Sequence, residues 1–231
     1  MTLVLRRRAA DLREAMEDPD CHPGRLRATY AQFAVLNRLL AGWRHVFERH
    51  LLPRAAPGTR LLDVGCGGGD VARRLAAWSA AAGAPLAVTA IDPDPRALAF
   101  ARARPAPPGV VFRQATLPEL AAEGARFDLV ISNHVLHHLG ERELVAFLEA
   151  SAAVTERLAV HNDVRRSDLA FAAFTPLWLA FPGSFLVPDG LRSIRRAYRP
   201  RELGRLAPGG WRVERLEPFR SLLLYEPEAR A

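Results

Sequence analysis

Residues 61–70 read LLDVGCGGGD, and this short stretch decides the fold of the chain. An apolar strand, Leu61 to Val64, runs into a turn rich in glycine and then into a helical stretch. Glycine accepts positive φ angles and lets a ligand approach the backbone closely. The helix that follows offers free N–H groups and the positive end of its dipole. This unit predicts a site for a nucleotide-like ligand at the carboxyl end of a strand.

Apolar runs and helical stretches alternate on the C-terminal side of this unit. The expected strands are residues 61–64, 86–91, 110–113, 129–132 and 158–161, and the expected helices are 71–82, 96–103 and 141–153. Such alternation is typical of a parallel sheet with helices on both faces. Two later apolar runs, residues 211–216 and 221–225, flank Glu217-Pro218 and predict an antiparallel hairpin at the sheet edge.

The N-terminal residues 1–52 read as helical instead. Apolar side chains recur there near helical spacing, as one buried helix face requires: Leu26, Tyr30, Phe33, Leu36, Leu40 and Trp43. Pro53 and Pro57-Gly58 then interrupt the pattern. We therefore expect an α/β protein with an N-terminal helical cap over residues 1–54 and a Rossmann-like domain over residues 55–231.

Composition narrows the class of protein. The chain has 231 residues, 49% of them hydrophobic, which is enough for one sizeable core. Two cysteines, Cys21 and Cys66, are too few for a disulfide framework and favour a reduced, cytoplasmic protein. Between Met1 and Ala10 an apolar run precedes three arginines, which is the reverse of an export signal. The sequence contains no run of about 18 apolar residues, so we expect no membrane span.

The formal charge is +7, and every basic side chain that contributes to it is an arginine. A basic protein is attracted to acidic partners such as nucleic acid or anionic lipid. The arginines are scattered along the chain, and Arg165-Arg166 and Arg195-Arg196 are examples of local pairs. This scatter favours a compositional origin for the charge, and we expect no nucleic-acid partner.

Three acidic residues around the glycine turn indicate what its ligand is. A dinucleotide fingerprint has glycine or alanine where this chain has Asp70, and a carboxylate there repels a pyrophosphate. Asp63 is placed to meet a positive charge, and Asp92, at the end of the next strand, to accept both ribose hydroxyls. S-adenosylmethionine has a ribose, an ammonium and a sulfonium, and no phosphate. The pattern therefore favours this cofactor over a nicotinamide dinucleotide.

From Arg60 to Tyr225 the chain resembles the class I S-adenosylmethionine-dependent methyltransferases. Residues 63–69, DVGCGGG, look like their first motif, Asp92 like their ribose acid, and residues 127–133, FDLVISN, like their fourth-strand motif. The resemblance implies a seven-stranded sheet with an antiparallel last strand. It implies a cofactor site made of Asp63, Gly65, Cys66, Gly67, Gly69, Asp92, Pro93, Thr116, Asn133 and His134. Thr116 replaces an acid that usually faces the adenine amino group, so charge assistance is lost there.

The segment from Val135 to Glu141 is similar to one in small-molecule O-methyltransferases of bacteria and plants. Their general-base histidine matches His137, whereas their following Asp-Trp is His138-Leu139 here, so the match is partial. A base at this place takes the proton of an oxygen acceptor. The alternative is a structural or solvent-facing His137. Arg165 is a candidate to stabilise an anionic acceptor oxygen.

A metal-assisted mechanism is the other possibility for this edge of the sheet. Some catechol-type methyltransferases use Asp and Asn where this chain has Asn162 and Asp163, and a further Asp at the position of Asn133. One firm carboxylate makes a weak magnesium site. We therefore expect no metal, and we expect Asp163 and Arg165 either to orient the substrate or to form a local ion pair.

The helical N-terminus carries a second resemblance. Residues 26–43 and 163–198 look like parts of methyltransferases associated with bacterial polyketide synthases, including type III. This implies a small phenolic, pyrone or quinone acceptor, aromatic or lipid-tailed, in a pocket that includes Tyr30, Phe33, His138, Asp163, Phe174 and Trp178. The apolar stretch from Leu169 to Pro182 is then a lid or wall of the pocket. A core helix and a membrane-surface contact are the other interpretations.

The atom that receives the methyl group stays open at this point. A C-methyltransferase acting on a quinone or lipid precursor is the alternative to an O-methyltransferase. A nucleic-acid methyltransferase is disfavoured because residues 133–136, NHVL, lack the prolines of the usual base-methylating motif. Only acceptor turnover distinguishes an enzyme from a non-catalytic cofactor-binding protein. The sequence carries no signal for an oligomeric state.

Overall fold

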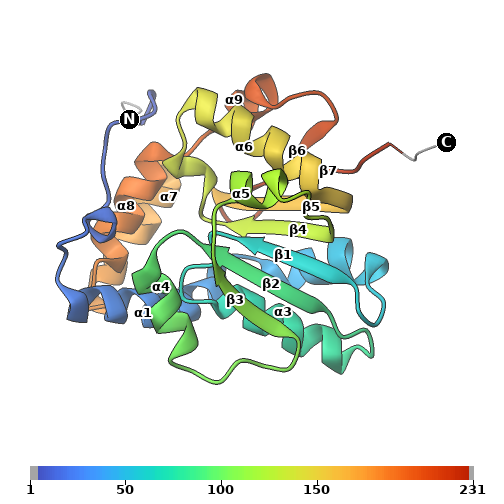
Figure 1. Cartoon of the computed structure of the whole chain (residues 1–231). Helices are drawn as coiled ribbons and strands as arrows, with labels where there is room; N and C mark the ends of the chain where they lie inside the picture. The colour runs from blue at the N-terminus through green and yellow to red at the C-terminus, as the bar shows by residue number, and fades with distance from the viewer. Residues whose placement is uncertain (1–4, 229–231) are drawn as a thin grey trace.

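The computed structural model describes residues 5–228, which contain a seven-stranded sheet (Figure 1). The strands are β1 (Arg60–Val64), β2 (Ala87–Asp92), β3 (Val110–Gln114), β4 (Phe127–Asn133), β5 (Thr155–Val164), β6 (Trp211–Leu216) and β7 (Arg220–Tyr225). Their order is β3-β2-β1-β4-β5-β7-β6. Strands β1 to β5 are parallel, and β7 lies antiparallel between β5 and β6. The predicted Rossmann-like fold with an antiparallel edge hairpin is confirmed.

Strand β5 is longer than the sequence predicts. Its apolar run suggests four residues, whereas the strand has ten residues, Thr155–Val164. The polar residues Asn162 and Asp163 near its end are buried, because partners on other elements hold their side chains. A pattern of apolar residues therefore misses the part of β5 that carries the site.

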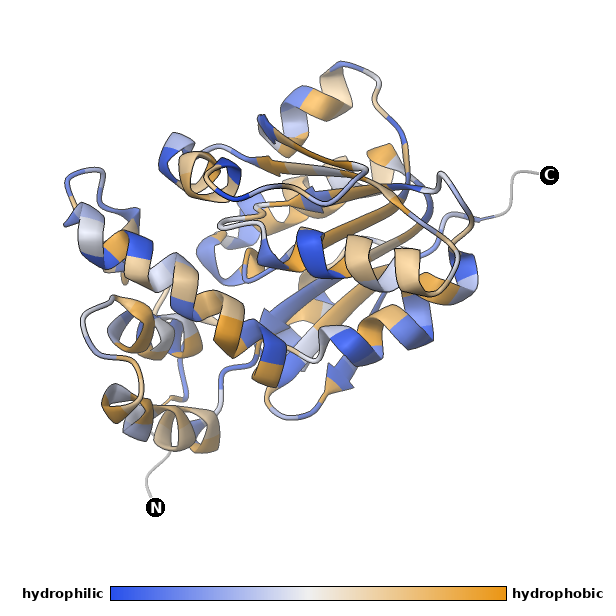
Figure 2. Ribbon diagram, turned by 90° about the horizontal axis from the view of Figure 1, so that it is seen from below, coloured by the Kyte–Doolittle hydropathy of each residue, from blue (hydrophilic) through white to orange (hydrophobic). Residues whose placement is uncertain are grey.

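Helices cover both faces of the sheet, and alternate strand residues contribute to two cores. The helices are α1 (Pro23–Leu40), α2 (Trp43–Val46), α3 (Asp70–Ala81), α4 (Pro95–Arg102), α5 (Leu117–Ala122), α6 (Glu141–Val154), α7 (Asp168–Phe174), α8 (Leu186–Arg196) and α9 (Pro200–Leu206). Leu61 of β1 packs with residues of α2 and α3, whereas Leu62 packs with residues of α5 and α6. Figure 2 shows largely hydrophobic strands inside helices of mixed hydropathy.

The N-terminal residues differ from the helical prediction. Helix α1 begins at Pro23, and residues 5–22, here called the N-terminal segment, form turns and one short 3-10 helix, Ala15–Glu17. The segment lacks the apolar periodicity of α1. Its backbone is instead held by a buried side chain, since Ala15 and Met16 donate their N–H groups to the Asp189 carboxylate at 2.8 and 2.9 Å.

Two N-terminal predictions fall partly outside the structure. Both the helix predicted over residues 1–52 and the stretch without an export signal, residues 1–10, include residues 1–4. These four residues lie outside the described residues. Within residues 5–228, no helix has the length and apolar character needed to cross a bilayer.

The stretch from Leu169 to Pro182 is not a core helix. It comprises most of α7 and a 3-10 helix, Thr175–Leu179, and the Leu179 side chain is 91% exposed. Other residues of the stretch, including Ala173 and Phe174, line a cavity. Together with α1, α8 and the N-terminal segment, it gathers at the end of the sheet where β1 and β4 terminate (Figure 1). This placement fits the prediction that the stretch is a wall of a pocket.

Candidate functional site

A cavity of about 510 Å³ lies at the carboxyl ends of β1, β2 and β4. The glycine turn after β1 forms one wall, where Gly65 and Gly67 have φ angles of 68° and 52°. A Cβ built on Gly67 meets no atom within 4 Å, so the turn is open to a ligand there. Gly69 differs from its predicted role, because it does not line the cavity. A Cβ on Gly69 lies 2.5 Å from Phe112, so this glycine permits packing at the start of α3.

Three carboxylates surround the glycine turn. Asp63 is 1% exposed, and neither of its oxygens has a hydrogen-bond partner within the described part of the chain. Burial, reinforced by the charges of Asp70 and Asp92, raises the pKa of Asp63 well above its usual value. Asp92 instead accepts from the N–H groups of Gly67 and Asp94, at 2.8 and 2.9 Å. Buried acids of this kind fit a cationic ligand and repel a phosphate.

Cys66, Pro93 and Thr116, three of the predicted cofactor residues, line the same cavity, and their cofactor contacts stay predictions. Thr116 is the N-cap of α5, and its hydroxyl donates to Glu119 Oε2 at 2.9 Å. The adenine amino group is a donor, so the predicted contact needs a lone pair on the Thr116 oxygen. That oxygen accepts the Glu119 N–H at 3.4 Å and keeps a second lone pair, so the adenine contact stays a prediction. Burial raises the pKa of the Cys66 thiol, so this side chain stays neutral and contributes an apolar wall.

A buried arginine, Arg220 of β7, connects the residues that end β4 and β5. Its guanidinium donates to Asn133 Oδ1 at 2.7 Å, to Asn162 Oδ1 at 2.8 Å and to His134 Nε2 at 2.9 Å. Because a guanidinium only donates, His134 carries its proton on Nδ1. Burial, reinforced by the Arg220 charge, lowers the pKa of His134 well below its usual value. Asn133 and His134 line the cavity, and their cofactor contacts stay predictions.

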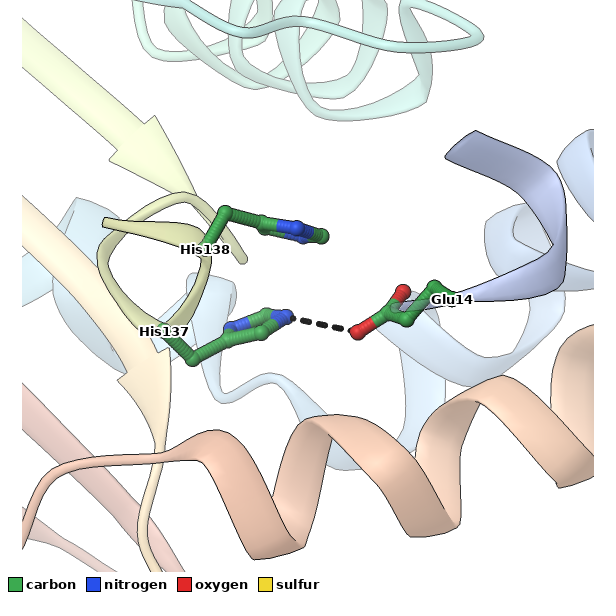
Figure 3. A group of neighbouring side chains, drawn as sticks. All are labelled: Glu14, His137 and His138. Carbon is green, nitrogen blue, oxygen red and sulfur yellow. Dashed lines mark ion pairs between the residues drawn. The ribbon is translucent and has the colours of Figure 1, made fainter. Parts of the chain in front are cut away.

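His137 lies in a short helix after β4, Leu136–His138, and reaches the cavity between two carboxylates. Its Nδ1 lies 2.7 Å from Asp163 Oδ1, and its backbone N–H donates to Asp163 Oδ2 at 2.8 Å. On the other side, Nε2 lies 3.3 Å from Glu14 Oε1 (Figure 3). Within residues 5–228, Nε2 has no hydrogen-bond partner. Since an ionised carboxylate only accepts, the Asp163 contact fixes a proton on Nδ1.

The two carboxylates decide the charge of this imidazole. Burial by itself would lower the pKa of His137, but Asp163 and Glu14 outweigh it and raise the pKa to about 9. Burial of the two acids favours their neutral forms, yet the contacts with His137 hold the pKa values of Asp163 and Glu14 below the usual range. In this arrangement His137 is positively charged at neutral pH and becomes a free base near pH 9.

The other predicted acceptor residues divide between the cavity and the rest of the fold. Tyr30, Phe33 and His138 line the cavity. Asp163 lies behind His137, so its role is to hold the imidazole rather than to touch an acceptor. Arg165 is not placed to stabilise an acceptor oxygen, because its guanidinium lies outside the cavity and pairs with Glu217 at 3.0 Å. Trp178 is also misassigned, since it is 49% exposed and lines neither cavity.

A second cavity, of about 310 Å³, adjoins the first. Phe33, His134 and Ser193 line both cavities, so the two are neighbours at these side chains. The other walls are mostly apolar side chains of α1, α7 and α8, and Phe174 is one of them. The site therefore combines a chamber at the glycine turn, where acidic and histidine side chains lie among apolar ones, with an apolar neighbouring chamber.

The residues considered as metal ligands from the sequence already bind side chains of the protein, Arg220 or His137. Asn133 and Asn162 both accept from Arg220, and both Asp163 oxygens contact His137. Within residues 5–228, two other groups have metal-ligand spacing, with candidate atoms within 4.8 Å of one another: Glu14, His137 and His138, and His134, His137 and Asp163. Both groups need His137, which already lies between two carboxylates.

Comparisons with known proteins agree with this geometry. A methyltransferase domain model matches residues 61–157. The chain is 35% identical over 164 residues to the ubiquinone biosynthesis O-methyltransferase of Methylocella silvestris, covering 66% of this chain and 57% of that protein. It is 33% identical over 176 residues to the protein of the same name from Azotobacter vinelandii, covering 73% of this chain and 68% of that one. This chain belongs to the class I S-adenosylmethionine-dependent methyltransferases.

The cofactor of this methyltransferase is S-adenosylmethionine. Its fold is that of the plantazolicin methyltransferase BpumL in complex with SAH, with a TM-score of 0.60 and 10% identity over 93% of each chain. The chain spans 57% of the length of the Methylocella relative. Both relatives are named for ubiquinone biosynthesis, so the predicted association with polyketide synthases gains no support from them.

The sequence did not single out two residues of this site. Glu14 is isolated from every motif, and Arg220 reads as an ordinary charge in an edge hairpin. One signal could have identified Arg220. It is the single charged residue of β7, whose remaining residues are a serine, three leucines and the terminal Tyr225. No local signal marks Glu14, which reaches the site through the path of the N-terminal segment.

Proposed function

We propose that this methyltransferase methylates a hydroxyl oxygen of a phenolic or quinone-type small molecule with an apolar substituent. The observation that carries the proposal is the His137–Asp163 pair, which presents Nε2 beside the cavity of the glycine turn. The names of the relatives, O-methyltransferases of ubiquinone biosynthesis, support oxygen as the acceptor atom and a quinone precursor as its class. The apolar second cavity supports a substituent on the ring.

In the proposed mechanism, S-adenosylmethionine supplies the methyl group for an in-line displacement. The glycine turn, Asp63 and Asp92 bind the cofactor, and Tyr30 and Phe33 orient the acceptor ring. Holding the acceptor in line and excluding water lowers the barrier, because less entropy is lost on reaching the transition state. His137 removes the hydroxyl proton: the O–H bond of the acceptor breaks and the proton goes to Nε2. A phenol has a pKa near 10, so a base with a pKa of about 9 is well matched to it.

A series of 4-alkylcatechols tests this function. Methyl transfer from radiolabelled S-adenosylmethionine is expected with 4-methylcatechol, and KM is expected to fall along the ethyl, butyl and octyl members, because each buried CH₂ contributes about 0.8 kcal/mol. The product should be an aryl methyl ether by mass spectrometry and NMR. Turnover should persist in EDTA, since Arg220 engages the amide oxygens that a magnesium ion would need.

Other outcomes of this series have clear meanings. Ring-carbon methylation would replace the proposal with the C-methyltransferase alternative. Loss of turnover on chelation with recovery in magnesium would assign Asp163 and Asn162 to a metal. A KM that does not depend on chain length, both in the wild type and in an Ala173→Phe variant that fills the second cavity, would remove the apolar substituent from the proposal.

Two glycine variants test the proposed cofactor wall. Gly67→Ala and Gly83→Ala both place a side chain at positive φ, at 52° and 75°, and neither new Cβ meets an atom within 4 Å. Each should lose about 1–2 kcal/mol of stability to backbone strain. Only Gly67 lines the cavity, so only Gly67→Ala should weaken SAH binding in calorimetry, by about tenfold or more (about 1.4 kcal/mol). Equal SAH affinities in the two variants would contradict the assignment.

A further inference from the structure

Glu14 reaches the acceptor site from outside the methyltransferase motifs. It belongs to the N-terminal segment, is 4% exposed, and lines the large cavity beside His137. Its Oε1 lies 3.3 Å from His137 Nε2 and accepts the Ser193 hydroxyl proton at 2.7 Å. Figure 3 shows the carboxylate pointing directly at the edge of the imidazole. A buried carboxylate is costly without partners, so this placement needs a reason.

The N-terminal segment is fastened where Glu14 needs it. Asp189 of α8 accepts two backbone N–H groups next to Glu14, from Ala15 and Met16. On one side of Glu14, the Arg8 guanidinium donates to the backbone carbonyls of His137 and Leu139. On the other side, Glu17 accepts from Arg196 at 2.7 Å and contacts His138 Nδ1 at 2.6 Å. These contacts join the segment to α8 and to the short helix that carries His137.

We propose that Glu14 is a positioning residue for His137: together with Asp163 it brackets the imidazole, holds its orientation, and sets the pH range in which His137 accepts the acceptor proton. The inference rests on the proposed function. His137 Nε2 is buried, has no hydrogen-bond partner among residues 5–228 and lies 3.3 Å from Glu14, so an acceptor hydroxyl that reaches Nε2 must come in beside Glu14. The N-terminal segment therefore contributes a third member to the acceptor site.

The charged and titratable groups around His137 come from several elements. Asp163 of β5 and Glu14 contact the ring directly. The His138 ring packs against it at a tilt of 37° with ring centroids 4.1 Å apart, and His134 lies edge-on at 6.0 Å. Arg8 holds the His137 carbonyl, Glu17 and Arg196 act through His138, and Arg220 faces the Asp163 side. Only the two carboxylates in direct contact favour the charged imidazole strongly, and Glu14 is the one that touches Nε2.

A proton-NMR-detected titration of ¹⁵N-histidine-labelled protein tests the inference without an acceptor. The His137 signal, assigned by its loss in His137→Gln, should titrate near pH 9 in the wild type. In Glu14→Gln it should titrate lower by about one pH unit or more, because an opposite charge at this range shifts a pKa by about 1–3 units. Ser193 can still donate to the amide oxygen of the introduced glutamine, so this isosteric change should preserve the fold.

Glu17→Gln is the matched control. It removes a carboxylate from the same segment but from the side of His138, so it should leave the His137 titration in place while loosening the segment comparably. If the His137 titration shifts equally in both variants, loosening of the N-terminal segment explains the shift and the inference is wrong. It is also wrong if the His137 titration does not shift in Glu14→Gln. With 4-methylcatechol as acceptor, the rising limb of kcat/KM against pH should move with the NMR titration, and an unmoved limb would remove Glu14 from the reaction.

Failure of this inference can be distinguished from failure of the proposed function. If His137→Gln abolishes turnover while Glu14→Gln leaves the titration and the pH limb unchanged, only the role of Glu14 is wrong. If no phenol is methylated, the proposed function fails, and the NMR titration still decides whether Glu14 controls His137.

Discussion

His137→Gln is expected to lower kcat with a catechol acceptor by about 10²–10⁴-fold, the usual range for loss of a general base. The variant keeps a polar side chain of similar reach but has no site that accepts a proton at working pH. SAH affinity should change little, because the cofactor wall is the glycine turn after β1. Single-turnover kinetics with 4-methylcatechol would measure the loss directly. His45→Gln, an exposed position on α2, is the control for a histidine substitution elsewhere.

The pH dependence of this defect follows from the charge of His137. A base must be unprotonated to act, and the pKa of His137 is raised to about 9 by Asp163 and Glu14. Wild-type kcat/KM should therefore rise with pH until about pH 9 and then level off, since kcat/KM reports groups of the free enzyme. The deficit of His137→Gln should shrink above about pH 10, because the phenol then ionises without help. If kcat/KM of His137→Gln lies within about threefold of the wild-type value at pH 9, His137 is not the base and catalysis rests on positioning alone.

The cofactor side of the molecule was readable from the sequence because its determinants are local. Leu61 to Gly69 place a strand, a turn and a helix in one short stretch, and positive φ angles at Gly65 and Gly67 follow from the residue type. Asp92 is predictable for the same reason, since it ends a strand that must lie beside β1 in a parallel sheet. Even here, local rules misjudge Gly69, whose Cβ-free backbone is needed for packing against Phe112.

The acceptor side was less readable because long-range contacts decide it. The spacing of the motif located His137, but the two carboxylates that set its charge come from β5 and from the N-terminal segment. For Asp163 the sequence predicts either substrate orientation or a local ion pair, and the structure has the ion pair, with His137; the choice depends on the register of β5 against β4. Arg165 was favoured for its charge, whereas the buried cation of the site is Arg220 on β7, which pairs with β5 only in the folded sheet.

Arg220→Met is expected to destabilise the fold by about 3 kcal/mol, because it removes the donor that three buried neutral acceptors share. Arg220 is 4% exposed, and its guanidinium satisfies Asn133, Asn162 and His134 at once. Methionine matches the apolar stem but leaves all three acceptors without this donor, at a typical cost of about 1–3 kcal/mol for each that stays unsatisfied. Urea denaturation at neutral pH would measure the change in the free energy of unfolding.

Arg212→Met on the neighbouring strand β6 provides the control. That guanidinium has a side chain 47% exposed and pairs with Glu214 and Glu226 at 3.3 and 3.1 Å, so its loss should cost no more than about 1 kcal/mol. Arg220 also fixes the neutral Nδ1–H form of His134, which lines both cavities. The folded fraction of Arg220→Met should therefore show a changed His134 signal in the ¹⁵N-histidine spectrum, whereas Arg212→Met should not. Equal losses of stability in the two variants would show that water or neighbouring side chains replace the Arg220 guanidinium. The residues shared by the two cavities would then not depend on the charge of Arg220.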